Sequence, residues 1–388
     1  MNVRVRQSDF LMIMVCLLLI NIPYASQTIN NIFVLSVEVL LIFFLKDISI
    51  RGIKENKDII LFATAIFICT FLNHGISTRT ASAFVTGLRY ILLFYTVLYY
   101  CKKRTVKNAI SIFVRFLGIM VILADLSIFV TLFTSGVSEH GGVYNTYIIG
   151  NKFVVSYYHM FFLALYQIEL KKKLRSDKFK FSMLALLSIG VCYLVECNTG
   201  VVGCFVVILI RMLSVKKNAL VEILSKPIVF CGVLIAANFI LVGTDFLLKD
   251  NFVTDLLMKY SHTNKILTGR LDMYLIALNE FSKSPIIGYG INCTVVEDLL
   301  TWGNAQNGLL KIMLDFGIVG VVSFILVCFG ALRQKGKYTA NLTIKYGLLS
   351  FLYGMIVCSL VEININSIFI VALAMYSSTV KNNNYIDD

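Results

Sequence analysis

Long apolar runs recur along the whole chain and are separated by short segments that carry most of its charges. A membrane-spanning helix needs about 20 predominantly apolar residues, and somewhat fewer when aromatic residues frame it at the interfaces. By that measure the sequence predicts twelve transmembrane helices, at about 10–29, 31–45, 58–73, 81–100, 108–133, 153–170, 181–197, 200–213, 227–247, 306–332, 345–363 and 365–380.

The composition excludes a soluble domain. Hydrophobic residues make up 58% of the 388 residues and charged residues only 15%, so a soluble fold would have too few polar side chains to cover its surface. The formal net charge of +13 could indicate nucleic-acid binding. However, the basic residues form short clusters between apolar runs, and no basic face is free to follow phosphates. The sequence therefore predicts an all-α polytopic membrane protein, and no nucleic acid is expected as a partner.

The positions of Lys and Arg predict the orientation, because cytoplasmic loops are enriched in both. With the N-terminus inside, the basic clusters fall in inner segments, and the short outer loops hold only Arg79 and Lys152. Both termini are then cytoplasmic. The single integral membrane domain is divided into helices one to nine (1–247), a large extracytoplasmic loop with short interfacial helices (248–305), helices ten to twelve (306–380) and a cytoplasmic tail (381–388).

Ten cysteines lie mostly inside the apolar runs, without CxxC spacing, and Cys293 alone lies deep in the large loop. They are expected to act as small apolar side chains, neither as disulfides nor as metal ligands.

Charged residues inside a membrane are costly, so each needs a partner or a function. Arg89 lies well inside its predicted helix. It can form an internal ion pair with Glu38 or Asp125, or it can line a cavity that opens to the outside, and the sequence leaves both readings open. Lys311 and Asp315 are four residues apart and are expected to pair on one helix face.

The large loop contains a predicted amphipathic helix that starts at Thr268. Its apolar face would rest on the outer leaflet. Pro285 ends the helix and Gly288-Tyr289-Gly290 forms the turn after it. Arg270 then lies near the helix start, where free backbone N–H groups also favour an anion. The residues predicted for the apolar face are Leu271, Tyr274, Leu275, Leu278 and Phe281.

After this turn, Asn307 opens a helix that contains Asp315–Gly320. The order of Gly-Arg, amphipathic helix, Pro, Gly-Tyr-Gly and this helix resembles the C-terminal signature of the O-antigen polymerase (Wzy) and O-antigen ligase family. Two shorter motifs, Ile149–Lys152 and Asn198–Gly200, also resemble motifs of that family. The predicted span count and the large outer loop agree with the resemblance.

The resemblance implies a glycosyltransferase of O-antigen or capsule biosynthesis, in the bacterial cytoplasmic membrane and with its site on the outer face. A polymerase of this kind transfers a growing glycan from undecaprenyl pyrophosphate to a second lipid-linked repeat unit. Its partners would be undecaprenyl-pyrophosphate-linked oligosaccharide repeat units and membrane lipid, with a chain-length regulator and a flippase as further candidates. The resemblance implies no nucleotide sugar, no cofactor and no obligatory metal.

Such an enzyme must position two lipids and stabilise negative charge on the leaving pyrophosphate. Guanidinium groups suit this role because they stay charged and bind phosphate oxygens bidentately. Arg270 and Arg89 are therefore the predicted catalytic cations, and His262 is the predicted base for the acceptor hydroxyl. Predicted substrate-binding residues are Arg79, Lys152, Gln306, Asn307, Glu196 and Glu362, the two glutamates being alternative bases.

One position departs from the family pattern. The family often has a His before the Asn that opens the helix after the loop, whereas Gln306 precedes Asn307 here. Glutamine can orient a hydroxyl or phosphate oxygen, but it cannot act as a base near neutral pH. The difference favours the polymerase branch. Ligase-type transfer to another acceptor and a flippase for lipid-linked oligosaccharides remain alternatives.

Several aromatic residues are expected on the outer side. They would form an interfacial belt or stack on sugar faces. They are Tyr144, Tyr147, Tyr157, Tyr158, Tyr260, Tyr289 and Trp302.

Overall fold

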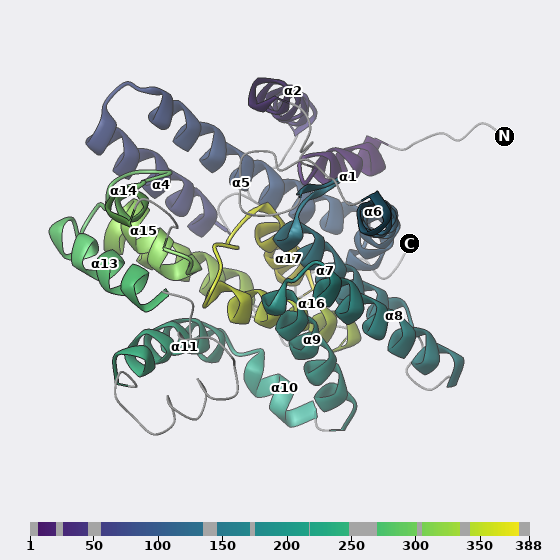
Figure 1. Cartoon of the computed structure of the whole chain (residues 1–388). Helices are drawn as coiled ribbons and strands as arrows, with labels where there is room; N and C mark the ends of the chain where they lie inside the picture. Colours follow the sequence, from purple (N-terminus) through teal and green to yellow (C-terminus); the bar gives the residue numbers. More distant parts are fainter. Residues whose placement is uncertain are drawn as a thin grey trace.

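The computed structural model describes residues 7–20, 26–45, 56–134, 146–170, 175–216, 218–247, 270–300, 305–333 and 342–379. These residues are almost entirely helical (Figure 1). Two short antiparallel strands, β1 (Thr146–Tyr147) and β2 (Gly150–Asn151), form a hairpin before α7. The helices are α1 (Gln7–Leu17), α2 (Gln27–Leu45), α4 (Asp58–His74), α5 (Thr78–Lys103), α6 (Val106–Thr134), α7 (Lys152–Glu169), α8 (Arg175–Leu194), α9 (Asn198–Lys216), α10 (Asn218–Leu224), α11 (Pro227–Leu247), α13 (Arg270–Lys283), α14 (Val295–Leu300), α15 (Gly308–Leu332), α16 (Leu342–Ser359) and α17 (Ser367–Ser378).

Among the described residues, four helical stretches are long and apolar enough to cross a membrane: Thr78–Lys103, Val106–Val130, Gly308–Leu332 and Leu342–Ser359. Several shorter helices are also apolar. Each predicted span overlaps a helix of the structure, although α1 ends at Leu17, well before the predicted boundary at 29. The all-α membrane architecture agrees with the structure, and the count of twelve spans stays a prediction.

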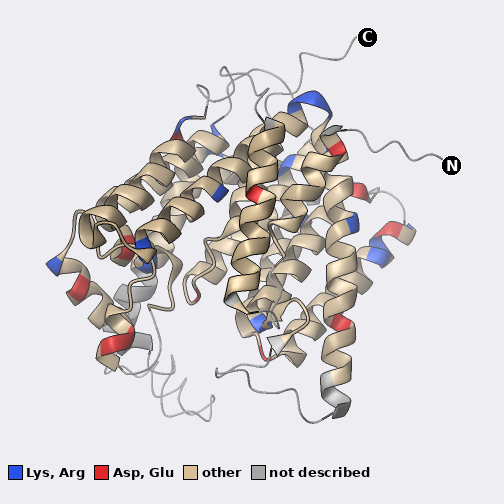
Figure 2. Ribbon diagram, turned by 90° about the horizontal axis from the view of Figure 1, so that it is seen from above, with Lys and Arg blue, Asp and Glu red and all other residues tan. Residues whose placement is uncertain are grey.

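The surface of the bundle suits lipid. Charged residues are sparse along the helix ribbons (Figure 2). On one apolar face of α6 the side chains are more than half exposed, because few other side chains of the bundle cover them. Lipid tails would cover such a face in a membrane. The exposed side chains of this face are Ile119, Ile122, Leu126 and Phe129.

Helices α16 and α17 lie at the centre of the bundle (Figure 1). Nearly every residue of both is buried. Helix α16 packs against α7 and α9, and α17 packs against α5 and α15. Helix α17 contains no Lys, Arg, Asp or Glu, so it can be enclosed on all sides at no cost in buried charge.

Glycines bring three of these helices close together. A Cβ atom at Gly200 in α9 would collide with Ser156 of α7. One at Gly203, also in α9, would lie 2.6 Å from the sulfur of Met160 and 2.9 Å from that of Cys358. Small residues at these positions therefore let α7, α9 and α16 approach more closely than larger side chains would allow, as is common in membrane bundles.

The predicted outer aromatic residues do not form a surface belt where the structure describes them. Tyr147, Tyr157 and Tyr158 are at most 4% exposed and lie inside the bundle. Tyr289 is half-buried beside α15. Tyr144, Tyr260 and Trp302 lie outside the described residues.

Candidate functional site

Hydrogen bonds join the first turns of several helices at one end of the bundle. The Nζ of Lys152, in the first turn of α7, donates to the carbonyl oxygen of Glu196, just before α9, at 3.2 Å. The thiol of Cys358, near the last turn of α16, donates to the carbonyl of Thr199 in the first turn of α9, also at 3.2 Å. We call this the Asn307 end, where α7, α9, α15 and α17 begin and α8 and α16 finish.

Asn307 joins the start of α15 to the finish of α16. Its side-chain carbonyl accepts from the amide of Leu310 and so caps α15, at 2.9 Å. Its side-chain amide donates to the carbonyl of Leu360, also at 2.9 Å. The hydroxyl of Tyr274 in α13 donates to the same carbonyl at 3.0 Å and approaches the carbonyl of Gln306 at 3.5 Å. Gln306 itself adopts a left-handed conformation with φ 37°.

Asparagine caps also start α7 and α17 at this end. The side chain of Asn151 accepts from the amides of Phe153 and Val154, and Asn366 caps α17 in the same way. Gly150 adopts φ 137°, a backbone conformation that favours glycine, in the β-hairpin just before this cap. In the Gly-Asn-Lys motif, Gly150 thus belongs to the hairpin, Asn151 caps α7, and Lys152 is the first residue of α7.

The Asn307 end carries both charges and buried polar groups. Glu362, in the turn between α16 and α17, is 9% exposed. Glu196 is exposed and adopts φ 55°. Arg79 lies half-buried in the first turn of α5, close in sequence to the end of α4. The structure therefore gathers five of the six predicted substrate-binding residues at one end, namely Lys152, Glu196, Gln306, Asn307 and Glu362.

Helix α15 is broken at Gly317, and a segment of the large loop fills the break. The amide of Ile318 donates to the carbonyl of Pro285 at 2.8 Å, and the amide of Tyr289 donates to the carbonyl of Leu314 at 2.8 Å. Backbone groups that the break frees from the helix thus find partners in the loop. We call this contact the backbone interlock. Its other two bonds run from Val319 N to Ile286 O at 3.2 Å and from Gly290 N to Asp315 O at 2.7 Å.

Two glycines make the backbone interlock possible. Gly317 adopts φ 61° and Gly288 φ 63°. A Cβ atom at Gly317 would collide with the backbone of Ile286, and one at Gly288 with the carbonyl of Leu314. Each position thus requires both the conformational freedom and the small size of glycine. The interlock gives a physical reason for the Pro, Gly-Tyr-Gly and Asp-Phe-Gly motifs.

Helix α4 supports the loop from the other side. The Nε2 atom of His74 lies 2.8 Å from the carbonyl oxygen of Tyr289. The amide of Ile291 donates to the hydroxyl of Thr70 at 3.0 Å. The loop segment is therefore held between α4 and α15.

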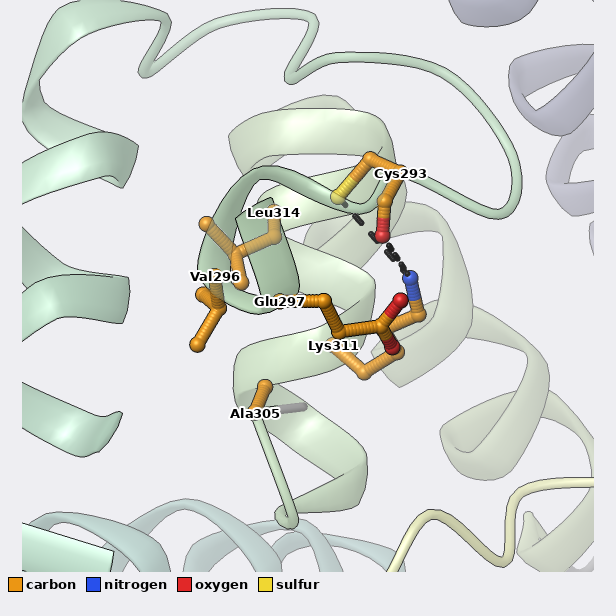
Figure 3. A pocket seen from close by; sticks show the side chains of 6 residues that line it. All are labelled: Cys293, Val296, Glu297, Ala305, Lys311 and Leu314. Carbon is orange, nitrogen blue, oxygen red and sulfur yellow. Dashed lines mark hydrogen bonds between the residues drawn. The ribbon is translucent and has the colours of Figure 1, made fainter. Parts of the chain in front are cut away.

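Lys311 and Asp315 pair as their spacing predicts, and Lys311 also bonds to Cys293 of the loop (Figure 3). Lys311 Nζ lies 2.8 Å from Asp315 Oδ1 and donates to the carbonyl of Cys293 at 2.9 Å. The amide of Cys293 donates to the same Asp315 oxygen at 3.2 Å. Burial, together with the nearby charge of Asp315, raises the pKa of the Cys293 thiol to about 12. A small pocket beside these groups is lined by Cys293, Val296, Glu297, Ala305, Lys311 and Leu314 (Figure 3).

Helix α13 begins at Arg270 and ends at Lys283, two residues before Pro285, close to the prediction. Its face packs on protein. Met273, Tyr274 and Ala277 are at most 1% exposed and form a hydrophobic cluster with residues of α14 and α15. The face of α13 that includes Tyr274 therefore packs against α14 and α15 of the same chain.

Residues 183–325 match the family model Wzy_C, which is described as O-antigen ligase. Over these residues the chain is similar to the O-antigen ligase/Wzy family, as its motifs predicted. Members of this family are membrane enzymes that transfer glycans. No curated protein matches the chain.

The segment that matches the O-antigen ligase family contains every residue of the backbone interlock. The matched segment also contains α13, which begins at Arg270, and the two adjacent residues Gln306 and Asn307. Arg79, Arg89, Lys152 and Glu362 lie outside the matched residues.

Arg89 forms the internal ion pair that was one of its two predicted alternatives. Its Nε lies 2.8 Å from Glu38 Oε1, which joins α5 to α2. The Glu38 side chain is 1% exposed and that of Arg89 26% exposed. The other possible partner, Asp125, lies 3.0 Å from Nε2 of His159. A catalytic role of Arg89 stays a prediction. In that role, Arg89 would have to bind substrate while it is paired with Glu38.

The two other predicted catalytic residues are described less fully. Arg270 is the first residue of α13, and its side chain lies outside the described part of the chain. His262 lies outside the described residues altogether. Within the ranges that the structure describes, no group of three His, Cys, Asp or Glu residues could hold a metal ion.

Sequence reasoning did not single out the contacts of His159 and Tyr157. His159 is fully buried between Asp125 and Ser188, whose hydroxyl lies 3.4 Å from its Nδ1. Tyr157 has a buried hydroxyl at the Asn307 end. The sequence indicated Tyr157 only as one of several outer aromatic residues, and it could not indicate which helices would face either side chain.

Proposed function

We propose that the protein is a polysaccharide polymerase that transfers a growing glycan from undecaprenyl pyrophosphate to a second lipid-linked repeat unit. A hydroxyl of the acceptor sugar forms the new glycosidic bond to the donor sugar. The bond between that sugar and the pyrophosphate breaks, undecaprenyl pyrophosphate leaves, and a base takes up the hydroxyl proton. No nucleotide sugar enters the reaction, because the lipid pyrophosphate is already the leaving group.

The observation that carries the proposal is the gathering of predicted substrate-binding residues at the Asn307 end. Lys152 supplies a cation, Asn307 and Gln306 supply amide groups, and Glu196 and Glu362 supply carboxylates. Cations and amide donors suit a pyrophosphate, and carboxylates suit sugar hydroxyls. The match of residues 183–325 to a family of glycan-transferring enzymes supports the same interpretation.

We assign the base to a residue other than Gln306, because an amide cannot accept a proton near neutral pH. His262 and the two glutamates are the candidates. Glu362 fits best among the described residues, since it is 9% exposed and lies in the turn that Asn307 holds through Leu360. Arg270, with Arg79 at the rim, would stabilise the leaving pyrophosphate.

The Asn307 end would then be the outer face of the cytoplasmic membrane, with twelve spans and both termini inside. This orientation follows from the placement of Lys and Arg in the sequence. A flippase would supply the lipid-linked repeat units to that face, and a chain-length regulator would limit the product.

A second candidate function is ligation of the glycan to another acceptor, which the description of the matching family model favours. One reconstitution separates the candidates. Purified protein in vesicles would receive undecaprenyl-pyrophosphate-linked repeat units and no nucleotide sugar. A ladder of longer lipid-linked products supports the polymerase. Transfer only when lipid A core is added supports the ligase, and movement of unchanged substrate across the bilayer supports a flippase.

A further inference from the structure

The hydroxyl of Tyr157 is buried without a hydrogen-bond partner among the described residues. Its side chain is 4% exposed. The next residue differs, since the hydroxyl of Tyr158 donates to the carbonyl of Leu19 at 2.8 Å. A buried polar group without a partner costs free energy, so such groups in native proteins usually have a ligand, a water or a function.

Tyr157 lies on the face of α7 that packs against α16. One turn further along α7, Phe161 stacks on Phe351 of α16 with 4.3 Å between ring centroids. Residues three or four apart share a helix face, so Tyr157 faces the part of α16 nearest the Asn307 end.

Helices α7, α9 and α16 pack closely near Tyr157. Met160, three residues further along α7, lies against Gly203 of α9 and Gly354 of α16, where a Cβ would come within 2.6 and 2.8 Å of its sulfur. The hydroxyl is thus positioned by three closely packed helices. Such rigid support suits a group that must bind a ligand in one orientation.

A second polar atom without a partner belongs to the same end. The Oδ1 atom of Asn364 is buried and unpaired among the described residues, while its Nδ2 donates to the carbonyl of Met355 at 2.7 Å. Asn364 lies two residues after Glu362, in the turn between α16 and α17. One end of the bundle thus holds a free hydroxyl, a free carbonyl oxygen and a largely buried carboxylate. A sugar hydroxyl can both donate to and accept from such groups.

We propose that the Tyr157 hydroxyl binds a sugar hydroxyl of the lipid-linked repeat unit, beside Glu362 at the Asn307 end. This inference rests on the proposed function and makes Tyr157 a substrate-binding residue of the same site. The hydroxyl is covered in this structure, so the groups that cover it must move apart when the sugar binds. The sequence indicated Tyr157 only as one of several aromatic residues that would form a belt or stack on sugar faces, and neither the family motifs nor the charge pattern indicates a role for its hydroxyl.

The test compares two adjacent tyrosines that each lose only a hydroxyl, Tyr157→Phe and Tyr158→Phe. Both variants are purified in detergent, their melting temperatures are measured, and their elongation of undecaprenyl-pyrophosphate-linked repeat units is measured in vesicles. Y157F should keep or raise the melting temperature, since it removes an unpaired buried group. Its rate at limiting substrate should fall about tenfold, the effect of one lost substrate hydrogen bond. Y158F should lower the melting temperature and keep its rate per folded protein.

Two results would overturn the inference. A Y157F variant that elongates at the wild-type rate shows that the hydroxyl does not bind substrate. A Y157F variant that melts as low as Y158F shows that the hydroxyl has a structural partner. If the wild-type protein itself fails to elongate, the proposed function is wrong and the inference falls with it. The wild-type result therefore distinguishes the two failures.

Discussion

The backbone amide of Ile318 in α15 donates to the carbonyl of Pro285 in the large loop, at 2.8 Å. In an unbroken helix this amide would donate to Leu314, whose carbonyl instead accepts from Tyr289 of the same loop. The first turns of α15, which begin at the Asn307 end, are therefore joined to the loop by main-chain bonds. Truncating the side chains of Ile318, Tyr289 or Leu314 would leave these main-chain bonds in place.

Gly317→Ala should disrupt the backbone interlock. The added Cβ would collide with the backbone of Ile286, and φ 61° is unfavourable for alanine. We expect a loss of at least about 2 kcal/mol in the free energy of unfolding, seen as a lower melting temperature and reduced elongation. Gly190→Ala in α8 is the matched control. No atom lies within 4 Å of its Cβ position, so it should keep stability, and equal behaviour of the two variants would refute the role of the interlock.

The sequence alone showed the motifs of this region, but it could not show that their residues form main-chain bonds with one another. Pro285, the Gly-Tyr-Gly turn and Asp315–Gly320 were visible as motifs, and the helix between Arg270 and Lys283 was predicted within about two residues. The interlock depends on backbone groups of two segments that meet only in three dimensions. A sequence pattern records side chains, and it carries no direct signal for main-chain pairing across a broken helix.

The pair of Arg89 and Glu38 allows a structural role to be separated from a catalytic one. Arg89→Ala alone leaves a carboxylate that is 1% exposed without its partner. Removing one member of a buried ion pair costs about 3–5 kcal/mol, so the level of folded protein should fall. Glu38→Gln in the same chain removes the stranded charge and should restore that level.

The double variant R89A/E38Q then decides the role of Arg89. Elongation at the wild-type rate per folded protein would assign Arg89 to helix packing. A folded double variant with no elongation would assign it to the reaction. Glu38→Gln alone is the control, since it keeps the guanidinium and should elongate.

Labelling of cysteines can test the orientation, but native Cys293 cannot serve as the reporter. It is 6% exposed, and its thiol pKa of about 12 is above the usual value of about 9. The neutral thiol therefore persists at pH 7–9, where an exposed thiol would already ionise, and an impermeant maleimide should react very slowly. Labelling of Cys293 at neutral pH in intact cells would contradict this burial.

Introduced cysteines can replace it, because all ten native cysteines are buried. Ser282→Cys lies on the exposed side of α13 and should label in intact cells. Asn108→Cys, near the start of α6, should label only after the membrane is permeabilised. The reverse pattern would invert the orientation.

Asn307 and Asn366 both cap helices, but Asn307 alone of the two also holds Leu360 in the described contacts. Asp caps a helix as well as Asn does, so Asn366→Asp should leave stability nearly unchanged. Asn307→Asp removes the donor to Leu360 and should cost about 1–2 kcal/mol. Melting temperatures of the two purified variants give the comparison. Equal values would show that the bond to Leu360 contributes nothing.

The candidate site could be predicted only in part, because its members come from distant segments. The sequence predicted Glu362 as an alternative base, and helix-start motifs indicated Lys152 and Asn307. The convergence of these residues depends on how α7, α9 and α16 pack, and glycines such as Gly203 determine that packing. For Arg89 the sequence offered two partners, and only the packing of α2 against α5 decided between them.

Arg270 gives the most direct test of the proposed leaving-group stabilisation. Arg270→Ala should abolish or shorten the polymer at a normal protein level, because a guanidinium group suits pyrophosphate oxygens and the backbone N–H groups of the same helix start also favour an anion. Asn279→Ala, an exposed position of the same helix, controls for changes in α13 itself. Both variants are expressed in a strain that lacks the gene, and the chain-length distribution of the surface polysaccharide is measured on gels. An unchanged distribution in the R270A strain would remove Arg270 from the reaction, and an equal loss in both strains would point to the fold of α13 instead.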